Sequence, residues 1–560
     1  MSRAEPAPLA ALPRLGRLAL AFGLLFGAGP GLVGPSPSPL GLLGIALWAS
    51  CARRGGRGAF ACEWLVAGAY FAAQISWLGY VWWPSVPFGA VVLGVTAALA
   101  GVLLRRLTRR HSLPLATALA WTSLECVRAL VPPPLGLGWL RLGHFALEVP
   151  LLPESARVWG VEGLSFCLAA LAGGLAALAG RRALSRAAFA WSVGPALGGL
   201  ALALAVPAPA TAPGPRLLLV QPAIPQERKN SAPAEEILRS SLVLTAEGLA
   251  RLEREGEPAV DLVCWGETML RALVVGRELE AAVGEVRFDP WFEVADEEIA
   301  GLFVALDRRE RSILEVLSGP AARILPEGAS FLTGAEVLVR DGGRVRRTNS
   351  VVLYDAKGRR TGRALKRHLV PGAESLMGLE SSAWVRETVH ELAGYVPDFL
   401  SGRETGVLTL EGESRRWRIA ASVCFDNAFL DVYTDPVREG AVDLHLVVSN
   451  EAWYRGSFEL DQMVAFSRLA ALATGRSVVR VANSGISCAI DPRGRELARL
   501  RVGGVDRDVP GTLAVRPPVP VDAAARLPYV LLQPFLAWIL VGAGLAAGLL
   551  SFRNCAPEEV

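Results

Sequence analysis

Hydrophobic residues are concentrated in two parts of the chain, and the part between them has the polar and apolar mixture of a soluble domain. Long apolar runs fill residues 9–206 and return at 527–550. A membrane-spanning helix needs roughly 20 apolar residues. Runs of suitable length lie at about 17–34, 38–52, 59–81, 86–104, 112–131, 160–180, 187–206 and 527–550. The pattern therefore predicts a membrane body of about seven helices over residues 1–206 and a last membrane helix over 527–552.

The charges in the loops between these runs indicate how the body is oriented. Alternate loops are rich in arginine, whereas the loops 35–37 and 82–85 carry no charge. The arginines are Arg53, Arg54 and Arg57, then Arg105, Arg106, Arg109 and Arg110, then Arg181, Arg182 and Arg186. Positively charged loops stay in the cytoplasm. The chain is therefore expected to emerge on the outer side of the membrane near residue 207. The first run could also be a cleaved signal peptide, but the runs that follow favour a retained helix.

The region between the two apolar parts alternates short apolar segments with helical ones, which is typical of an α/β fold. A proline-rich linker is expected at 207–216, followed by a domain at 217–526. Apolar, β-branched strands are predicted from Leu217 and at Asp261–Trp265, Ser330–Val339, Thr348–Tyr354, Trp417–Cys424, Leu444–Ser449 and Ser477–Val481. Helices are predicted at 232–255, 296–318, 380–395 and 459–475. The charged stretch 276–329 is interpreted as an insertion with one amphipathic helix.

Composition excludes several other classes of protein. Hydrophobic residues make up 52% of the chain and charged residues only 20%, as expected for a membrane protein. The net charge of +4 is small and the basic residues are dispersed, so no nucleic-acid partner is indicated. Eight cysteines lie at irregular spacings and five histidines are scattered. The sequence therefore predicts neither a metal site nor a cofactor.

Three short segments carry candidate chemistry, and each is expected to place a polar residue at the end of a strand. Glu267 follows the strand at 261–265, Lys366 precedes a Pro-Gly turn, and Cys424 ends an apolar strand. Strand ends are where α/β proteins build their sites. Each residue alone could be a surface carboxylate, a solvated lysine or a buried structural thiol. Together they suffice for acyl transfer, because a carboxylate can take the thiol proton and an ammonium can stabilise the thiolate and an oxyanion.

The order Glu, Lys, Cys at strand ends resembles the nitrilase superfamily. With the membrane body, the chain is similar to the apolipoprotein N-acyltransferase family of the bacterial inner membrane. The lysine segment Lys366-x-His368-Leu369-Val370-Pro371 is a specific match, and so is Ser449-Asn450-Glu451-Ala452-Trp453-Tyr454. Further matches are Gly475-Arg476 with Arg480-x-x-Asn483, Glu125-x-x-Arg128, Trp139-x-x-Leu142-Gly143 and Gly160-x-x-Gly163-x-Ser165.

This resemblance implies an αββα sandwich for the soluble domain and a role for each matched residue. Glu267 would be the general base, Lys366 the oxyanion stabiliser and Cys424 the acyl nucleophile. Glu374 and Asp426 would support the triad, and Trp453 with Tyr454 would form a substrate-gating loop. The family usually has Cys-x-Glu where this chain has Asp426, and Pro-Phe-Gly-Glu where this chain has Pro371-Gly372-Ala373-Glu374. Neither departure removes a triad member.

The family also implies the reaction. A phospholipid would donate its acyl chain to Cys424 as a thioester. The α-amino group of an S-diacylglyceryl cysteine at a lipoprotein N-terminus would then accept it. The enzyme would lie in the bacterial inner membrane with its catalytic domain in the periplasm. Alternatives are a membrane-bound acyltransferase or amidase that uses another acceptor or water, and a transporter or scaffold that has lost catalysis.

Overall fold

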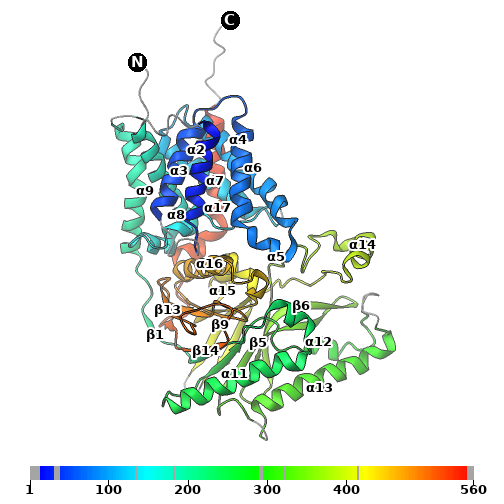
Figure 1. Ribbon diagram of the computed structural model, residues 1–560. Coiled ribbons are helices and arrows are strands. Elements are labelled where there is room, and N and C mark those ends of the chain that lie inside the picture. Colours follow the sequence, from blue (N-terminus) through cyan, green and yellow to red (C-terminus); the bar gives the residue numbers. More distant parts are fainter. Residues whose placement is uncertain are drawn as a thin grey trace. The chain divides into compact units, whose positions relative to one another are not determined.

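The chain forms two compact units, which are described separately (Figure 1). The computed structural model describes residues 13–30, 38–133, 135–180, 183–288, 294–320, 323–412 and 415–551. The membrane unit comprises Met1–Ala208, Ser457–Gly475 and Arg526–Val560, and the sandwich unit comprises Pro209–Gly456 and Arg476–Ala525.

Each apolar run predicted from the sequence overlaps a helix of the membrane unit, and residues 31–34 of the first run lie outside the described residues. The helices are α2 (Arg14–Gly27), α3 (Ser38–Ala52), α4 (Ala59–Gln74), α6 (Ser85–Leu107), α7 (Leu113–Leu130), α8 (Ala156–Ala179), α9 (Arg186–Ala205) and α17 (Pro528–Leu550), with the short α5 (Gly79–Trp82) between α4 and α6. By length and apolar composition, four described segments can cross a membrane, namely Ser85–Leu107, Leu152–Ala179, Arg186–Ala205 and Pro528–Leu550. The apolar helix Pro39–Ala52 is shorter.

Several buried charged side chains of the membrane unit form ion pairs. The fully buried Glu63 accepts hydrogen bonds from Arg14 at 2.8 Å and from Arg105 at 2.7 Å. Arg141 pairs with Glu162 at 2.6 Å. Because an unpaired charge away from water is costly, these pairs give the ionisable groups of the helices a structural purpose.

The sequence motifs found in the first 206 residues interlock in the structure. The carboxylate of Glu125 on α7 accepts a hydrogen bond from the backbone N–H of Leu142 at 2.7 Å. The guanidinium of Arg128 donates to the carbonyl of Trp139 at 3.1 Å, and the N–H of Gly143 donates to Ser165 Oγ on α8 at 2.8 Å. Side chains of α7 and α8 therefore hold the irregular segment 139–143 through hydrogen bonds to its backbone.

One helix of the membrane unit comes from the middle of the expected soluble domain. Helix α16 (Glu459–Thr474) is buried along most of its length. Its Gln462 accepts a hydrogen bond from Trp139 Nε1 at 2.6 Å and donates one to Gln74 at 3.1 Å. Gln462 therefore ties α16 to two other segments of the membrane unit.

The sandwich unit contains two sheets. The first runs in the order β14 (Gly511–Val515), β2 (Leu217–Gln221), β3 (Leu262–Trp265), β5 (Ser330–Asp341), β6 (Arg344–Tyr354) and β7 (Arg360–Leu365), with β4 (Leu273–Val275) beside β5. The second runs in the order β13 (Glu496–Arg499), β12 (Cys488–Ile490), β11 (Ser477–Ala482), β10 (Leu444–Ser449), β9 (Arg416–Val423) and β8 (Val407–Glu411). A separate pair joins β1 (Thr211–Pro213) to β15 (Pro518–Pro520).

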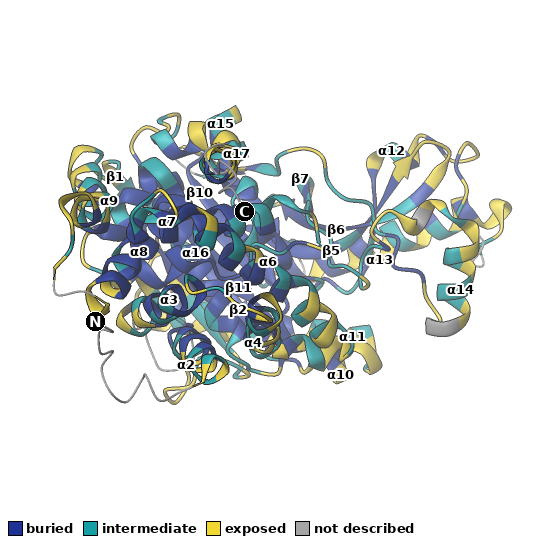
Figure 2. Cartoon of the chain, turned by 90° about the horizontal axis from the view of Figure 1, so that it is seen from above, coloured by how far each residue is buried: buried dark blue, intermediate teal, exposed yellow. Residues whose placement is uncertain are grey.

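The two sheets pack face to face with helices outside them. One apolar cluster takes residues from both sheets, among them Leu219, Leu332, Ile419 and Leu446. A second cluster lies between the first sheet and α11 (Ala234–Arg254) and α13 (Ile299–Ser318). On the second sheet, Tyr433 of α15 (Asp431–Glu439) packs against His445 with ring centroids 5.0 Å apart. These layers confirm the αββα sandwich. In Figure 2, strands such as β10 and β11 are coloured as buried, whereas α11 and α13 are partly exposed.

Apolar periodicity explains the outer helices. The buried residues of α11 are spaced three or four apart, which places them on one face: Ile237, Ser241, Thr245, Gly248 and Leu252. The amphipathic helix expected within 276–329 is α13, and its Ile313, Leu314 and Leu317 belong to the cluster under the first sheet. The predicted insertion therefore supplies part of the sandwich's outer layer.

Most predicted strands and helices of this unit are present, and the differences involve short elements. The sequence did not predict β4, β7, β8 or β12–β15 as strands. The segment expected to be only a linker contains β1, whose Ala212 pairs with Val519. The remaining helices are α10 (Gln226–Ser231), α12 (Arg277–Glu280) and α14 (Ala383–Ala393).

The shared core gives the first testable prediction. Leu446→Ala on the central strand β10 should lower the free energy of unfolding by about 2–5 kcal/mol, because it leaves a cavity between the sheets. The matched control Leu497→Ala, on the edge strand β13 where the side chain is half exposed, should change it by about 0.5 kcal/mol or less. Thermal unfolding in detergent compares the two, and equal losses would contradict the described core.

Candidate active site

The three residues singled out from the sequence all lie where a strand ends. Glu267 follows β3, Lys366 follows β7 directly, and Cys424 follows the last residue of β9. All three are buried, with side chains or whole residues less than a tenth exposed. The strands come from both sheets, so the sandwich brings together three segments that are far apart in the sequence.

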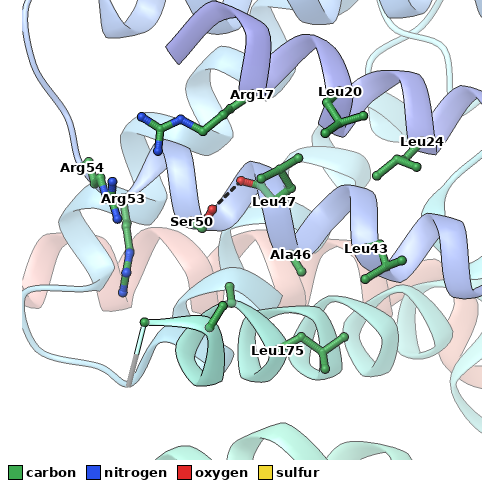
Figure 3. A pocket seen from close by; sticks show the side chains of 13 residues that line it. Arg17, Leu20, Leu24, Leu43, Ala46, Leu47, Ser50, Arg53, Arg54 and Leu175 are labelled. Atoms are coloured by element: carbon green, nitrogen blue, oxygen red, sulfur yellow. Dashed lines mark hydrogen bonds between the residues drawn. The ribbon is translucent and has the colours of Figure 1, made fainter. Parts of the chain in front are cut away.

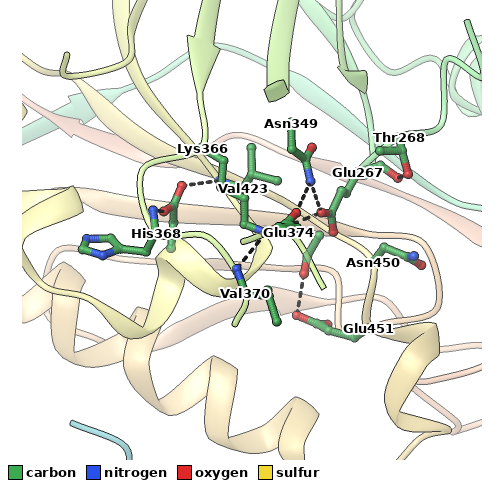
Figure 4. A network of polar contacts seen from close by, with 12 residues as sticks. Glu267, Thr268, Asn349, Lys366, His368, Val370, Glu374, Val423, Asn450 and Glu451 are labelled. Atoms are coloured by element: carbon green, nitrogen blue, oxygen red, sulfur yellow. Dashed lines mark hydrogen bonds and ion pairs between the residues drawn. The ribbon is translucent and has the colours of Figure 1, made fainter. Parts of the chain in front are cut away.

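A buried ammonium group forms the centre of the site (Figure 4). The Nζ of Lys366 lies 2.7 Å from Oε2 and 2.9 Å from Oε1 of Glu374, and 3.8 Å from Oε1 of Glu267. Burial by itself disfavours the ammonium. The two carboxylates outweigh it and raise the pKa of Lys366 above its ordinary value. Lys366 is therefore a permanent cation.

An asparagine that the sequence analysis did not single out joins the two carboxylates. The Nδ2 of Asn349, on β6, donates to Oε1 of Glu267 at 2.6 Å and to Oε1 of Glu374 at 2.9 Å. Its backbone carbonyl accepts the N–H of Lys366 at 2.8 Å. One residue thus fixes the positions of the base candidate, the lysine and the second carboxylate. Glu374 also accepts the N–H of Val370 at 2.9 Å.

The cysteine occupies a strained, buried turn. Its φ of 49° lies in the left-handed region, which residues other than glycine seldom adopt outside functional sites. Burial, followed by the negative charge of Glu267, raises the pKa of the Cys424 thiol well above its ordinary value, although Lys366 opposes this. The thiol is therefore protonated at neutral pH and needs a base before it can attack.

Asp426 holds the lysine segment and the cysteine turn together. Its carboxylate accepts the backbone N–H of His368 at 2.7 Å, of Arg367 at 3.1 Å and of Val423 at 3.2 Å. Burial raises the pKa of Asp426. The electrostatic effect of the nearby His368 and the backbone hydrogen bonds oppose that rise. The shorter aspartate still reaches both segments, so the departure from the family pattern keeps a bridge between them.

A second buried lysine supports Glu267 from the other side. The Nζ of Lys229, on α10, donates to the backbone carbonyl of Glu267 at 2.8 Å and to Thr268 Oγ1 at 2.7 Å. Burial, partly offset by the charge of Glu267, lowers the pKa of Lys229 to about 8. The residue fixes the turn that carries Glu267.

The segment 449–454, which matches the family, contributes one partner of a buried ion pair and a partly exposed ring. Glu451 and Arg480 are both fully buried and pair directly, and Ser449 Oγ donates to Glu451 at 2.9 Å. In the short helix Glu451–Tyr454, Trp453 is 40% exposed and Tyr454 is buried. The gating role of these two rings stays a prediction.

Sequence reasoning missed Asn349, Lys229 and the glycine that makes room for Glu267. A Cβ on Gly334 of β5 would lie 2.5 Å from the Cα of Glu267, so no other residue fits there. In the sequence, the one sign of Asn349 was that it is a polar residue at the start of an otherwise apolar predicted strand. Lys229 lies in the polar run Gln-Glu-Arg-Lys and gave no signal.

The arrangement contains the groups that thiol-based acyl transfer requires. It holds a nucleophile, a carboxylate able to accept its proton and a fixed positive charge. The resemblance assigned the roles of base, oxyanion stabiliser and nucleophile to these same positions.

Comparison with known families matches both units. The model described as the apolipoprotein N-acyltransferase N-terminal domain matches residues 20–174, and the carbon-nitrogen hydrolase model matches residues 253–503. These matches agree with the apolar helices and the αββα sandwich, and they identify the chain as a membrane protein of the nitrilase superfamily.

Whole-length relatives agree with the family models. The apolipoprotein N-acyltransferase of Azotobacter vinelandii is 30% identical over 487 residues, with 82% of each chain covered. That of Rhizobium etli is 28% identical over 472 residues and covers 80% of this chain and 78% of the relative. A solved amidase from Nesterenkonia sp. AN1 is 17% identical, covers 58% of this chain and 97% of its own, and has a TM-score of 0.32.

The bridge made by Asn349 gives a second prediction. Asn349→Leu removes both hydrogen bonds to the carboxylates and should lower acyl transfer at least about 10-fold, because Glu267 and Glu374 lose a shared donor. The control Asn230→Leu, on the exposed end of α10, should leave the rate within about twofold. Steady-state rates with a labelled donor compare the variants, and an unchanged rate in Asn349→Leu would contradict the bridging role.

The lowered pKa of Lys229 gives a prediction about stability and pH. Below pH 8 the lysine is protonated in both the folded and the unfolded chain. Between about pH 8 and its ordinary pKa of 10.5, the unfolded chain binds the proton and the folded chain releases it. Stability should therefore rise with pH by up to about 3 kcal/mol in wild type relative to Lys229→Met. Unfolding midpoints of both proteins at pH 7.5 and 10 test this, and a constant difference would disprove it.

Proposed function

We propose, because this chain belongs to the apolipoprotein N-acyltransferase family, that it transfers an acyl chain from a phospholipid to the N-terminal amine of a lipoprotein. The observation that carries the proposal is the buried cluster of Glu267, Lys366 and Glu374 beside Cys424. In this proposal Glu267 transfers protons, Lys366 stabilises the oxyanion, Cys424 carries the acyl chain, and Glu374 holds Lys366 in place.

In the first half-reaction, Cys424 takes the acyl chain. Glu267 accepts the thiol proton as the sulfur attacks the carbonyl carbon of the sn-1 ester. Lys366 stabilises the negative charge that develops on the carbonyl oxygen. The carbon–oxygen bond then breaks, Glu267 returns the proton to the leaving alkoxide, and a lysophospholipid departs. The product is a thioester on Cys424.

In the second half-reaction, the α-amino group of an S-diacylglyceryl cysteine attacks the thioester carbonyl. Glu267 accepts the proton that the amine loses, the carbon–sulfur bond breaks, and the thiolate recovers a proton from Glu267. An amide forms and the site returns to its starting state. No energy-rich cofactor is required, since the thioester is already activated.

The expected location follows from loop charge and from the substrates. The positive charge of the arginine-rich loops favours a cytoplasmic position for these loops. Residues 217–526 would then form a periplasmic catalytic domain at the inner membrane. Both substrates are lipids anchored in that membrane, so a multi-pass body serves this reaction better than a single anchor would. Trp453 and Tyr454 would control their entry.

A second candidate function keeps the same thioester and releases the acyl chain to water or to another acceptor. The burial of Cys424 disfavours it, because a site with little access to water protects a thioester from hydrolysis. The destination of a labelled acyl chain after it leaves Cys424 separates the two outcomes.

A labelled acyl chain tests the proposed function. Wild type given phospholipid with a labelled sn-1 chain should carry the label on Cys424 as a hydroxylamine-sensitive adduct. Addition of a diacylglyceryl-cysteine peptide should move the label to the peptide amine. Cys424→Ser should lower overall transfer by at least about 1,000-fold, and Lys366→Met by about 100- to 1,000-fold.

A matched variant controls for general damage to the protein. Cys62→Ser replaces a partly exposed cysteine of the membrane unit and should keep full activity. Label that leaves Cys424 for water alone would favour the hydrolase. Label that never reaches Cys424 in folded protein would disprove the nucleophile assignment.

A further inference from the structure

A groove in the membrane unit shares no residue with the active site. It has a volume of about 380 Å³ and lies between α2, α3 and the end of α8 (Figure 3). Five leucines form most of its apolar wall, namely Leu20, Leu24, Leu43, Leu47 and Leu175. The described lining therefore offers a long apolar surface for a hydrocarbon chain.

Three arginines gather at one end of this groove. Arg17 lies near the start of α2, and Arg53 with Arg54 follows the end of α3. Figure 3 shows them together at one side, with Leu24 and Leu43 at the other. An Nη of Arg53 lies 3.0 Å from the position that a Cβ of Gly180 would take, which places it against the end of α8.

The chemistry of the groove matches a phospholipid in charge and in polarity. Among the described residues that line it, three carry guanidinium groups and none carries a carboxylate. Arginine binds phosphate oxygens through paired hydrogen bonds. The absence of a lining carboxylate also disfavours a headgroup with its own ammonium, because that group would meet only positive charge.

The apolar wall is open toward the side where a bilayer would lie. Leu20, Leu43 and Leu175 are 42%, 50% and 42% exposed. Leu24 follows Arg17 by about two helical turns, or roughly 10 Å along the axis, so a chain held at the arginines can extend beside the leucines. Arginines that served only to orient the protein in the membrane would not need to come from two separate segments and meet at the end of an apolar wall.

We propose that this groove binds an anionic phospholipid, with its phosphate on Arg17, Arg53 and Arg54 and one acyl chain along the leucines. The lipid belongs to the leaflet on the side of the arginine-rich loops, and it stabilises the body without entering the reaction. The proposal does not rest on acyl transfer, since binding is measured without any acceptor.

Lipid binding to the full-length, delipidated protein in detergent tests the proposal. Native mass spectrometry would compare dioleoyl phosphatidylglycerol with dioleoyl phosphatidylcholine, which has the same chains and a zwitterionic headgroup. Wild type should hold phosphatidylglycerol at least 5-fold more tightly. The variant Arg17→Gln/Arg53→Gln/Arg54→Gln should lose at least 5-fold of that affinity.

Two further variants separate the groove from general charge. The control Arg57→Gln/Arg109→Gln/Arg110→Gln removes three exposed arginines outside the lining and should bind like wild type. Leu43→Trp keeps every arginine but fills the apolar wall, and should also weaken binding at least 5-fold. Equal affinity for both lipids, full binding by the first triple variant, or complete competition by equimolar inorganic phosphate would each overturn the proposal.

Discussion

The proposed active site depends on one interaction, the contact of a buried lysine ammonium with two carboxylates. An unpaired ammonium away from water costs several kcal/mol, so Lys366 can be buried only because Glu374 lies at 2.7 Å and Glu267 at 3.8 Å. Two carboxylates this close would in turn repel each other without the cation and the amide of Asn349. Each charged group therefore requires the others, and together they fix the geometry around Cys424.

The charge balance of this cluster explains how it can perform proton transfer without admitting water. With the thiol protonated, the two carboxylates and the ammonium sum to one negative charge. Transfer of the thiol proton to Glu267 leaves that sum unchanged, since the charge moves from an oxygen to the sulfur. The free energy of moving a charge within a preorganised site is far smaller than that of bringing a new one out of water. A thiol with a raised pKa thus suits a nucleophile that must stay inert until an ester is bound.

Local pattern was sufficient to predict the parts of the fold that repeat along the chain. Apolar runs gave the helices of the membrane unit, and β-branched segments gave the central strands, which are the elements buried on both faces. The short edge strands β8 and β13 cover only five and four residues, which is too short for their pattern to be recognised. The positions of Glu267 and Cys424 at strand ends were also predictable. Lys366 was singled out as well, although the strand before it, β7, was not predicted. Asn349 and Lys229 were not, because their roles depend on contacts across 82 and 38 residues of sequence.

The same distinction applies to the motifs of the membrane unit, which the sequence offered only as matches to a family, without a role. Glu125, Arg128 and Ser165 each bond to the backbone of the segment 139–143, so their polar groups satisfy a stretch that is not helical. In a membrane, irregular backbone is tolerated only where protein groups supply its hydrogen bonds. A polar residue within an apolar helix can therefore serve the fold as readily as it serves catalysis. The hydrogen-bond partners distinguish these roles, and here they give Glu125, Arg128 and Ser165 a structural role, which is consistent with the chemistry proposed for the sandwich.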